Sequence, residues 1–453
     1  MRALVLFSRI FVGSLFIVSG LIKANDPLGF SYKLEEYFAE SALGLPGLAP
    51  YALALGILAC LAEIVLGFAI LFGGRMKLAT AAVLALTLFF GWLTAFTARC
   101  NDRQAAGDPM TYTVMVNGVE QTQEMTCVTD CGCFGDAMKG SIGRSLTPWE
   151  SFTKDAILFV FLLPILIAAW SGGGIRWNTA AEDRILLPGA LVLVGVWSWI
   201  FTWWGPVLFT LFGYAGYRLI KARLEGPRAE WVSAGWATLI TLAFTWWCYA
   251  HLPVRDYRPY AVGKSIAEQK TMGKPPVIQT FVTYRNKTTG EAKEYDAAGA
   301  YPWDDDNFEY VDRRIVEVEA GILSPVSDFI LTDRDGYDLT NDVLAEQSPV
   351  LLITMYNAST AATGPMPAIA KLAQDANAAQ WYVYGLSASG WDDIEEVRHE
   401  HQLPFDFVQC DEKTIKTVVR ANPGIVLLQG GTVKGLWHGN DTPTFEEVKA
   451  LVQ

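Results

Sequence analysis

Residues 9–23 read Arg-Ile-Phe-Val-Gly-Ser-Leu-Phe-Ile-Val-Ser-Gly-Leu-Ile-Lys, an almost uncharged run between two basic residues. A helix rises about 1.5 Å per residue and the hydrocarbon layer is about 30 Å thick, so roughly 20 mostly apolar residues are needed to cross it. Extended back to Ala3, the run has that length. Because Arg9 interrupts it, no small-residue cleavage site follows and more apolar runs come after it, we expect a retained membrane helix and not a signal peptide.

Six further apolar runs have the length of a span: Tyr51–Gly73, Lys77–Ala98, Ser151–Trp170, Ile185–Trp204, Gly205–Lys221 and Trp231–His251. Residues 185–221 could form one overlong helix or a tight hairpin. The hairpin places most basic loop residues on one side, which the positive-inside bias makes the cytoplasmic side. We therefore expect seven spans, with loop 99–150 and the C-terminal part outside the cytoplasm.

Charge divides the chain into two halves. Residues 1–250 hold 17 Lys/Arg and 17 Asp/Glu, whereas residues 251–453 hold 18 and 30, so the whole net charge of −12 comes from the second half. The second half is therefore expected to be a soluble acidic module. An acidic balance of this size argues against nucleic acid as a partner.

Loop 99–150 holds four of the seven cysteines: Cys100, Cys127, Cys131 and Cys133. An oxidising compartment suits such a cluster better than the cytosol. A bond between Cys131 and Cys133 would close a very small ring, and strained disulfides exchange readily, with Cys127 or Cys100 passing electrons on. Thiolates need nearby cations, and we expect Lys23, Arg99, Arg103, Lys139, Arg144 and Lys154 near this loop.

Two other roles for the loop cysteines stay open. One or two inert disulfides could pin the loop over the helices. The four thiols could also bind zinc, although their spacing lacks the usual C-x2-C knuckle, and we expect no metal site.

Arg9 and Glu63 are charged residues inside predicted spans. Counted from the ends of their helices, their depths differ by only a few ångströms, so we expect them to pair. The pair could simply lock two helices together. It could also polarise a quinone carbonyl or carry a proton, which would make Arg9 and Glu63 a cofactor-binding site.

Three stretches carry a family resemblance: residues 9–23, Ala62-Glu63-Ile-Val-Leu-Gly67, and Asp130-Cys-Gly-Cys-Phe-Gly-Asp136. Together they resemble the DoxX/MauE group of four-helix membrane proteins over residues 1–170. The resemblance implies redox work: MauE-like proteins are associated with disulfide formation during maturation of a periplasmic enzyme, and DoxX-like proteins with a quinone oxidoreductase. Residues 33–38, 146–155 and 251–260 resemble the Bacteroidetes variety, which is fused to a C-terminal extracytoplasmic domain.

Residues 325–453 alternate strands and helices and end on a hairpin. This segment resembles the peroxiredoxin and cytochrome-maturation branch of the thioredoxin fold, and Asn422-Pro423 falls where that family has its cis proline. Where a working thioredoxin has C-x-x-C, this chain reads Tyr356-Asn-Ala-Ser-Thr-Ala-Ala-Thr-Gly364, with no thiol. We therefore expect a degenerate domain that docks clients and performs no exchange itself.

The predicted fold is a multi-pass α-helical membrane bundle, with a DoxX/MauE-like four-helix core and about three extra helices, followed by a C-terminal α/β thioredoxin-like extracytoplasmic domain. Its predicted parts are residues 1–171, accessory helices 172–252, a β-rich subdomain 253–324 and the domain 325–453. We expect an inner-membrane protein that assists thiol–disulfide redox or maturation of periplasmic or exported clients, in a quinone-linked manner. The alternative is a non-catalytic scaffold subunit of a periplasmic or outer-membrane-spanning complex. The candidate catalytic residues are Cys131, Cys133, Cys127, Cys100, Glu63 and Arg9.

Overall fold

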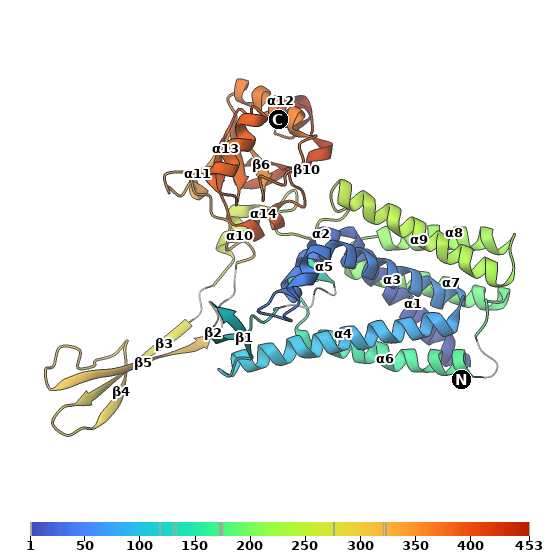
Figure 1. The fold of residues 1–453 in the computed structure, drawn as a ribbon, viewed down its shortest axis with the longest axis horizontal. Helices are drawn as coiled ribbons and strands as arrows, with labels where there is room; N and C mark the ends of the chain where they lie inside the picture. Colours follow the sequence, from blue (N-terminus) through green and yellow to red (C-terminus); the bar gives the residue numbers. More distant parts are fainter. Residues whose placement is uncertain are drawn as a thin grey trace. The chain divides into compact units, whose positions relative to one another are not determined.

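A computed structural model describes residues 2–116, 119–129, 132, 134–171, 175–274, 277–319, 321 and 324–452. The chain forms two compact units (Figure 1). The first comprises Met1–Arg258 with the short segments Thr417–Gly424 and Trp437–Thr442. The second comprises Pro259–Lys416, Ile425–Leu436 and Pro443–Gln453. The predicted division into four parts stays a prediction.

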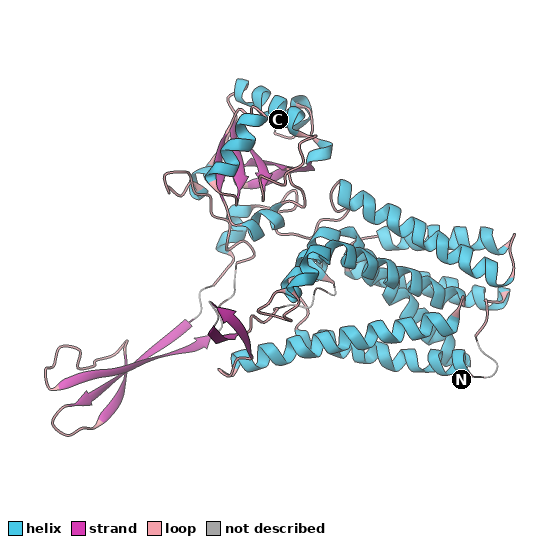
Figure 2. Cartoon of the chain, viewed as in Figure 1, coloured by secondary structure: helices cyan, strands magenta, loops and turns pink. Residues whose placement is uncertain are grey.

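The first unit is mainly helical (Figure 2). Its helices are α1 (Arg2–Asn25), α2 (Pro27–Phe38), the 3-10 turn η1 (Pro46–Tyr51), α3 (Ala52–Phe72), α4 (Met76–Ala105), α5 (Gly135–Ile142), α6 (Pro148–Trp170), α7 (Ala180–Ile200), α8 (Gly205–Lys221) and α9 (Gly226–Ala250).

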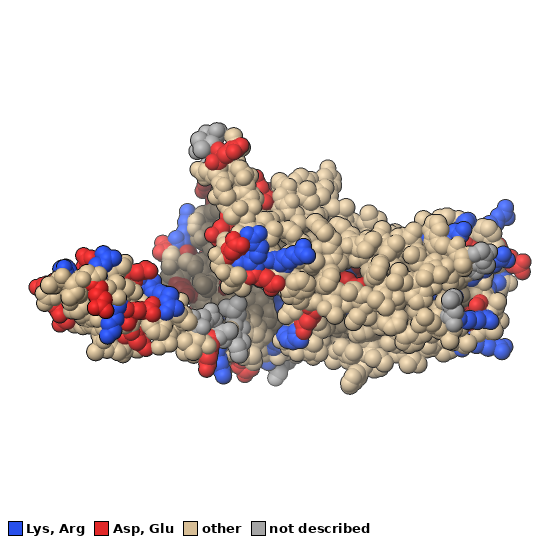
Figure 3. All heavy atoms as spheres, turned by 90° about the horizontal axis from the view of Figure 1, so that it is seen from below, with Lys and Arg blue, Asp and Glu red and all other residues tan. Residues whose placement is uncertain are grey.

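Five helices in the described part of the chain are long and apolar enough to cross a membrane, namely α1, α3 with its preceding turn, α4, α6 and α7. The protein is therefore a multi-pass membrane protein, as predicted. Figure 3 shows a broad face of these helices that is largely free of charged side chains, with Lys and Arg gathered at one end.

The ambiguous stretch 185–221 forms two helices, because α7 ends at Ile200 and α8 begins at Gly205. Thr202 adopts a positive φ of 51° in the turn, and Pro206 lies in the first turn of α8. Helices α8 and α9 thus form where spans were predicted. Neither of them is both long enough and apolar enough to be counted among the membrane-crossing helices. Helix α8 has only 17 residues, and Trp, Thr and Gly residues dilute the apolar character of α9.

Helix α1 is the central helix of the first unit. In its most apolar stretch of 18 residues, 78% of the residues are buried, against 50% or less in the other four candidate spans. Gly13 and Gly20 let α3 approach closely: a Cβ on Gly13 would lie 2.6 Å from Leu71, and one on Gly20 would lie 2.6 Å from Ile64. These two contacts set the register between α1 and α3.

A two-stranded antiparallel ribbon follows α4 and was not predicted. Its strands are β1 (Thr111–Val116) and β2 (Val119–Glu124). Only part of the usual hairpin signal is present: Asn-Gly at 117–118 is a pair typical of hairpin turns, but residues 119–124 hold a single apolar residue and do not alternate.

The two short C-terminal segments have polar partners inside the first unit. Arg420 donates to both carboxylate oxygens of Asp26, at 3.1 and 2.9 Å. Buried Arg258 binds Asp256 and donates to the carbonyls of residues 417 and 418. His251 contacts the carboxylate of Asp441 at 2.7 Å. Residues 417–424 and 437–442 are therefore held by side chains that lie outside the membrane helices.

The second unit contains most of a five-stranded sheet in the order β10-β9-β6-β7-β8. The strands are β6 (Val350–Met355), β7 (Tyr382–Ser387), β8 (Asp406–Gln409), β9 (Gly424–Gln429) and β10 (Thr432–His438), and β6, β7 and β8 are parallel. The helices around it are α11 (Thr340–Ala345), α12 (Met366–Ala378), α13 (Trp391–Glu400), α14 (Glu412–Val418) and α15 (Phe445–Lys449). Strand β6 is buried throughout, and the Asn422–Pro423 peptide is cis, as predicted. Strand β8 and helix α14 were not predicted.

A separate three-stranded sheet precedes this α/β region. It consists of β3 (Val277–Asn286), β4 (Ala292–Asp296) and β5 (Phe308–Glu319), with β3 in the middle. Short helix α10 (Ile266–Thr271) comes before it and the 3-10 turn η2 (Gly439–Asp441) lies near the C-terminus.

Candidate functional site

The base of the cysteine loop is closed by a disulfide between Cys100 and Cys127, whose Cα atoms are 5.6 Å apart. Cys100 lies near the end of α4 and is 2% exposed. The neighbouring backbone is also fixed: Asn101 donates to the carbonyl of Val128, and the amide of Thr126 donates to the carbonyl of Ser41. The sequence left the pairing open, and the structure resolves it for these two cysteines.

Cys131 and Cys133, the other two predicted site cysteines, lie outside the described residues. Their described neighbours are Gly132 and Phe134. A Cβ on Gly132 would lie 2.8 Å from Cγ of Lys33, so this glycine lies directly against the lysine side chain. Phe134 is buried, its ring is tilted against that of Phe201 with the centroids 5.2 Å apart, and the ammonium of Lys154 lies 5.3 Å from its centroid.

Two lysines thus lie beside the residues that flank Cys133. Each also has a carboxylate partner: Lys33 binds Glu36 at 2.5 Å, and Lys154 binds Asp155 at 2.9 Å. Lys154 was among the predicted cations, whereas Lys33 was missed. Lys23 was predicted near the loop but is buried in the bundle.

Lys23 and Glu63 form a buried ion pair. The ammonium donates to the two carboxylate oxygens at 2.5 and 2.8 Å and to Ser19 Oγ at 3.0 Å. Both side chains are 5% exposed. The rings of Phe30 and Phe90 lie 5.6 and 5.3 Å from the same ammonium, so α1, α2, α3 and α4 all meet at this cation.

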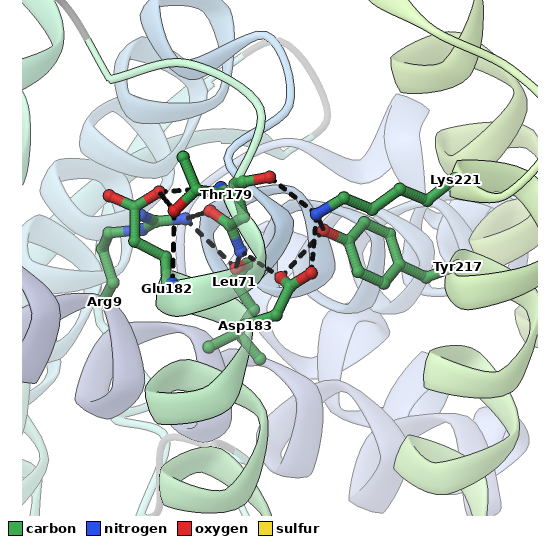
Figure 4. Close-up of polar contacts among 8 residues, drawn as sticks. Arg9, Leu71, Thr179, Glu182, Asp183, Tyr217 and Lys221 are labelled. Atoms are coloured by element: carbon green, nitrogen blue, oxygen red, sulfur yellow. Dashed lines mark hydrogen bonds and ion pairs between the residues drawn. The ribbon is translucent and has the colours of Figure 1, made fainter.

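The predicted pairing of Arg9 with Glu63 is therefore wrong. Arg9 donates to the carbonyl of Leu71 at 3.1 Å (Figure 4). It also donates to the carbonyl of Ile70 at 2.8 Å and to Asn178 Oδ1 at 2.6 Å. These carbonyls lie in the last turn of α3, where backbone acceptors have no helical partner. Arg9 thus caps the C-terminus of α3.

The rest of this polar cluster connects the accessory helices to α1 and α3 (Figure 4). Buried Asp183 accepts hydrogen bonds from Asn178 Nδ2 at 3.1 Å, from the Tyr217 hydroxyl at 2.9 Å and from Lys221 at 2.6 Å. Lys221 also donates to the Asn178 carbonyl at 2.6 Å. Because every charged group here has a partner, the cluster joins helices and offers no open binding position.

The register of α1 explains the error. With Gly13 against Leu71 and Gly20 against Ile64, Arg9 lies level with the end of α3 and Lys23 lies level with Glu63. Arg9 and Lys23 are 14 residues apart, which is about 21 Å along a helix. The expected pairing was based on the depths of Arg9 and Glu63 counted from the ends of their helices, and these depths do not include the register between α1 and α3.

The predicted quinone site does not fit the residues present. Arg9 donates to backbone and Asn178, and the Lys23 ammonium donates to Glu63 and Ser19. A groove of about 560 Å³ between α4 and α6 is lined by apolar side chains: Ala81, Leu84, Ala85, Leu88, Leu166, Ile167 and Trp170. Neither place presents a charged donor to a quinone carbonyl.

The remaining cysteines are Cys60, Cys248 and Cys410, which are buried and free. Burial raises the pKa of the Cys410 thiol to about 12, so this thiol stays protonated at neutral pH. In the loop after β6, the amide of Ala358 donates to Ser389 Oγ and the amide of Thr360 to Asn357 Oδ1. Residues 356–364 hold no cysteine.

Comparison with known proteins agrees with the membrane assignment. The family model described as methylamine utilisation protein MauE matches residues 1–106, which cover α1 to α4 with Cys60, Glu63 and Cys100. No curated protein matches the chain. The N-terminal part of this multi-pass membrane protein is therefore similar to the MauE family, and a separate α/β domain follows it.

Proposed function

We propose that this protein assists disulfide formation in periplasmic or exported proteins, with Cys131 and Cys133 as the exchanging pair. It would lie in the inner membrane with the cysteine loop and the C-terminal domain in the periplasm. The observation that carries the proposal is the Cys100–Cys127 disulfide. It uses two of the four loop cysteines to anchor the loop and leaves Cys131 and Cys133 as the remaining two.

The exchange balances without a metal or an organic cofactor. A client thiolate attacks one sulfur of a Cys131–Cys133 disulfide, forming a mixed disulfide and releasing the other loop thiolate. A second client thiolate then attacks the client sulfur of the mixed disulfide. The client gains a disulfide, the loop becomes a dithiol, and a disulfide of a partner protein reoxidises it by the same exchange.

The surroundings of the loop favour this chemistry. Thiolates are stabilised by nearby cations, and Lys33 and Lys154 contact the residues on either side of Cys133. The buried thiols Cys60, Cys248 and Cys410 lack such access. The MauE match of residues 1–106 is consistent with a membrane protein of this type.

We further propose that residues 325–453 form a degenerate thioredoxin-like domain that docks clients. The order of strands and helices and the position of Asn422–Pro423 support this fold. With no cysteine at 356–364 and only the protonated thiol of Cys410, the domain would bind and not exchange.

One observation favours a second candidate function, a non-catalytic scaffold. The charged clusters of the bundle, Lys23–Glu63 and Arg9–Asn178–Asp183–Lys221, join helices to one another and leave no reactive group exposed. A scaffold would need the Cys100–Cys127 disulfide but not Cys131 or Cys133.

Trapping of a mixed disulfide separates the two functions. In Cys133→Ser, the Cys131 thiolate attacks the disulfide of an oxidised peptide, which forms a mixed disulfide and releases the second peptide thiolate. Because Cys133 is no longer there to resolve this mixed disulfide, the covalent adduct should accumulate. Cys410→Ser is the matched control and should behave like the wild type. If neither Cys131→Ser nor Cys133→Ser changes adduct formation or peptide oxidation, the exchange proposal is wrong.

A further inference from the structure

The ribbon of β1 and β2 lies inside the stretch that the Cys100–Cys127 disulfide closes, and it is open on both sides. Each strand pairs only with the other among the described residues. Its described side chains are exposed, apart from the half-exposed Tyr112 and Val114. An isolated two-stranded ribbon is marginally stable alone, and the Cys100–Cys127 disulfide restrains the ends of the stretch that contains it.

The hydrogen-bond register tells which backbone groups point outward. The amide of Met125 donates to the carbonyl of Met110 at 2.7 Å, which makes 110 and 125 a hydrogen-bonded pair. In an antiparallel ladder such pairs alternate with non-bonded ones. Thr113 and Thr122 therefore form a non-bonded pair. The residues of β2 whose backbone amide and carbonyl point away from β1 are 120, 122 and 124.

The side chains of residues 120, 122 and 124 share one face of the ribbon, and this face is polar and acidic apart from Met115. Glu120 and Glu124 lie on the same face as Thr122, with Thr111, Thr113 and Met115 opposite them on β1. No basic residue occurs between residues 104 and 138. A second copy of the ribbon would bring the same two carboxylates against these, so self-pairing is disfavoured. A neutral or basic extended segment is the complementary partner.

We propose that the outer edge of β2 binds an extended, cysteine-bearing segment of the client by adding it as a third strand. Main-chain hydrogen bonds would supply affinity, as in other cases of strand addition, and the two glutamates would favour segments with Lys or Arg. Strand β2 leads to Cys127, and Cys131 is four residues further, at most about 14 Å of extended chain. The inference rests on the proposed exchange and adds the site that presents the client to it.

Two proline variants test the edge in the full-length protein. Thr122→Pro removes an outward amide of β2, and Thr113→Pro is the matched control because it removes an outward amide of β1. Neither position donates inside the ribbon. The probes are a Lys-flanked dithiol peptide, its serine analogue for binding by fluorescence anisotropy, and dithiothreitol as a small dithiol.

Thr122→Pro should weaken binding of the serine peptide and slow oxidation of the dithiol peptide by about fivefold or more, as expected for losing one or two backbone hydrogen bonds. Dithiothreitol oxidation should be unchanged, and Thr113→Pro should resemble the wild type. Equal effects of the two prolines, or none, would overturn the inference.

A charge variant distinguishes loss of the binding edge from unfolding of the ribbon. Glu120→Lys with Glu124→Lys should weaken the Lys-flanked peptide and strengthen a Glu-flanked one, a reversal that unfolding cannot produce. No reversal counts against the β2 edge. If the wild type binds the serine peptide but oxidises neither dithiol, the exchange proposal fails while the binding site stands.

Discussion

The Lys23 ammonium illustrates how one buried cation organises the first unit. It donates to Glu63 and Ser19 and lies near rings from α2 and α4. Removing one partner of a buried ion pair leaves an uncompensated charge, which typically costs about 3–5 kcal/mol. We therefore expect Lys23→Met to lower the unfolding free energy by that amount in detergent, and Lys23→Met with Glu63→Leu to recover most of it.

Glu63→Gln distinguishes a structural role from a chemical one. If the ion pair only joins helices, this variant should lose stability and keep its exchange activity per folded molecule. Full stability with abolished exchange would show that Glu63 takes part in the reaction, contrary to our assignment.

Cys410 provides a reactivity prediction at the same scale. Its pKa of about 12 means that very little thiolate exists at neutral pH, and only the thiolate is alkylated. Mass spectrometry after brief iodoacetamide treatment of the reduced protein should find the loop cysteines modified before Cys410. Equal or faster labelling of Cys410 would contradict its burial.

The free energy of unfolding should depend on pH through His438. Burial lowers its pKa below the usual 6.5, and its neutral Nδ1 accepts a hydrogen bond from the amide of Asn440 at 3.0 Å. A depressed histidine pKa means that the folded state resists protonation, so its stabilising contribution is present above pH 6.5 and is lost as the pH falls below that value.

Thermal unfolding measured between about pH 7 and pH 5 checks this sign. The wild type should lose more stability over that interval than His438→Gln, whose side chain does not titrate. A wild type that gains stability relative to the variant on acidification would show that the histidine is protonated in the folded state.

At the scale of elements, the C-terminus of α3 depends on Arg9. Arg9→Met leaves the Ile70 carbonyl without its donor, whereas the Leu71 carbonyl keeps Asn178. An unsatisfied buried acceptor costs about 1–3 kcal/mol, and loss of the charge adds to this. Arg9→Lys, which keeps the charge but not the fork of donors, should lie between Arg9→Met and the wild type in thermal unfolding. Equal stability of all three would contradict the capping role.

The elements also show what sequence could predict. Apolar length located the helices, and the turn between α7 and α8 followed from the distribution of basic residues. The partners of Arg9 and Glu63 did not follow, because the register between α1 and α3 depends on close contacts at Gly13 and Gly20 that length alone does not specify. The ribbon at 111–124 did not follow either, because β2 holds only one apolar residue, Val119, and so lacks the alternation that identifies a half-buried strand.

At the scale of the whole molecule, composition predicted a membrane part and a separate acidic part, and the alternation of strands and helices predicted an α/β fold for the latter. The apolar helices and the α/β sheet are both present. Candidate site residues were predicted less well. Cys100 and Cys127 form an anchoring disulfide, Arg9 and Glu63 belong to two different clusters, and Cys131 and Cys133 lie outside the described residues. The sequence places four of the seven cysteines in one loop. Which of these cysteines form a disulfide depends on which Cα atoms the fold brings close together.

The most direct test counts disulfides formed in a reduced client peptide by the oxidised full-length protein. Our account predicts that Cys131→Ser with Cys133→Ser abolishes this oxidation, whereas Cys60→Ser with Cys248→Ser and Cys410→Ser leaves it intact. Normal oxidation by the first variant, or its loss in the second, would contradict the assignment of the exchange to the outer loop.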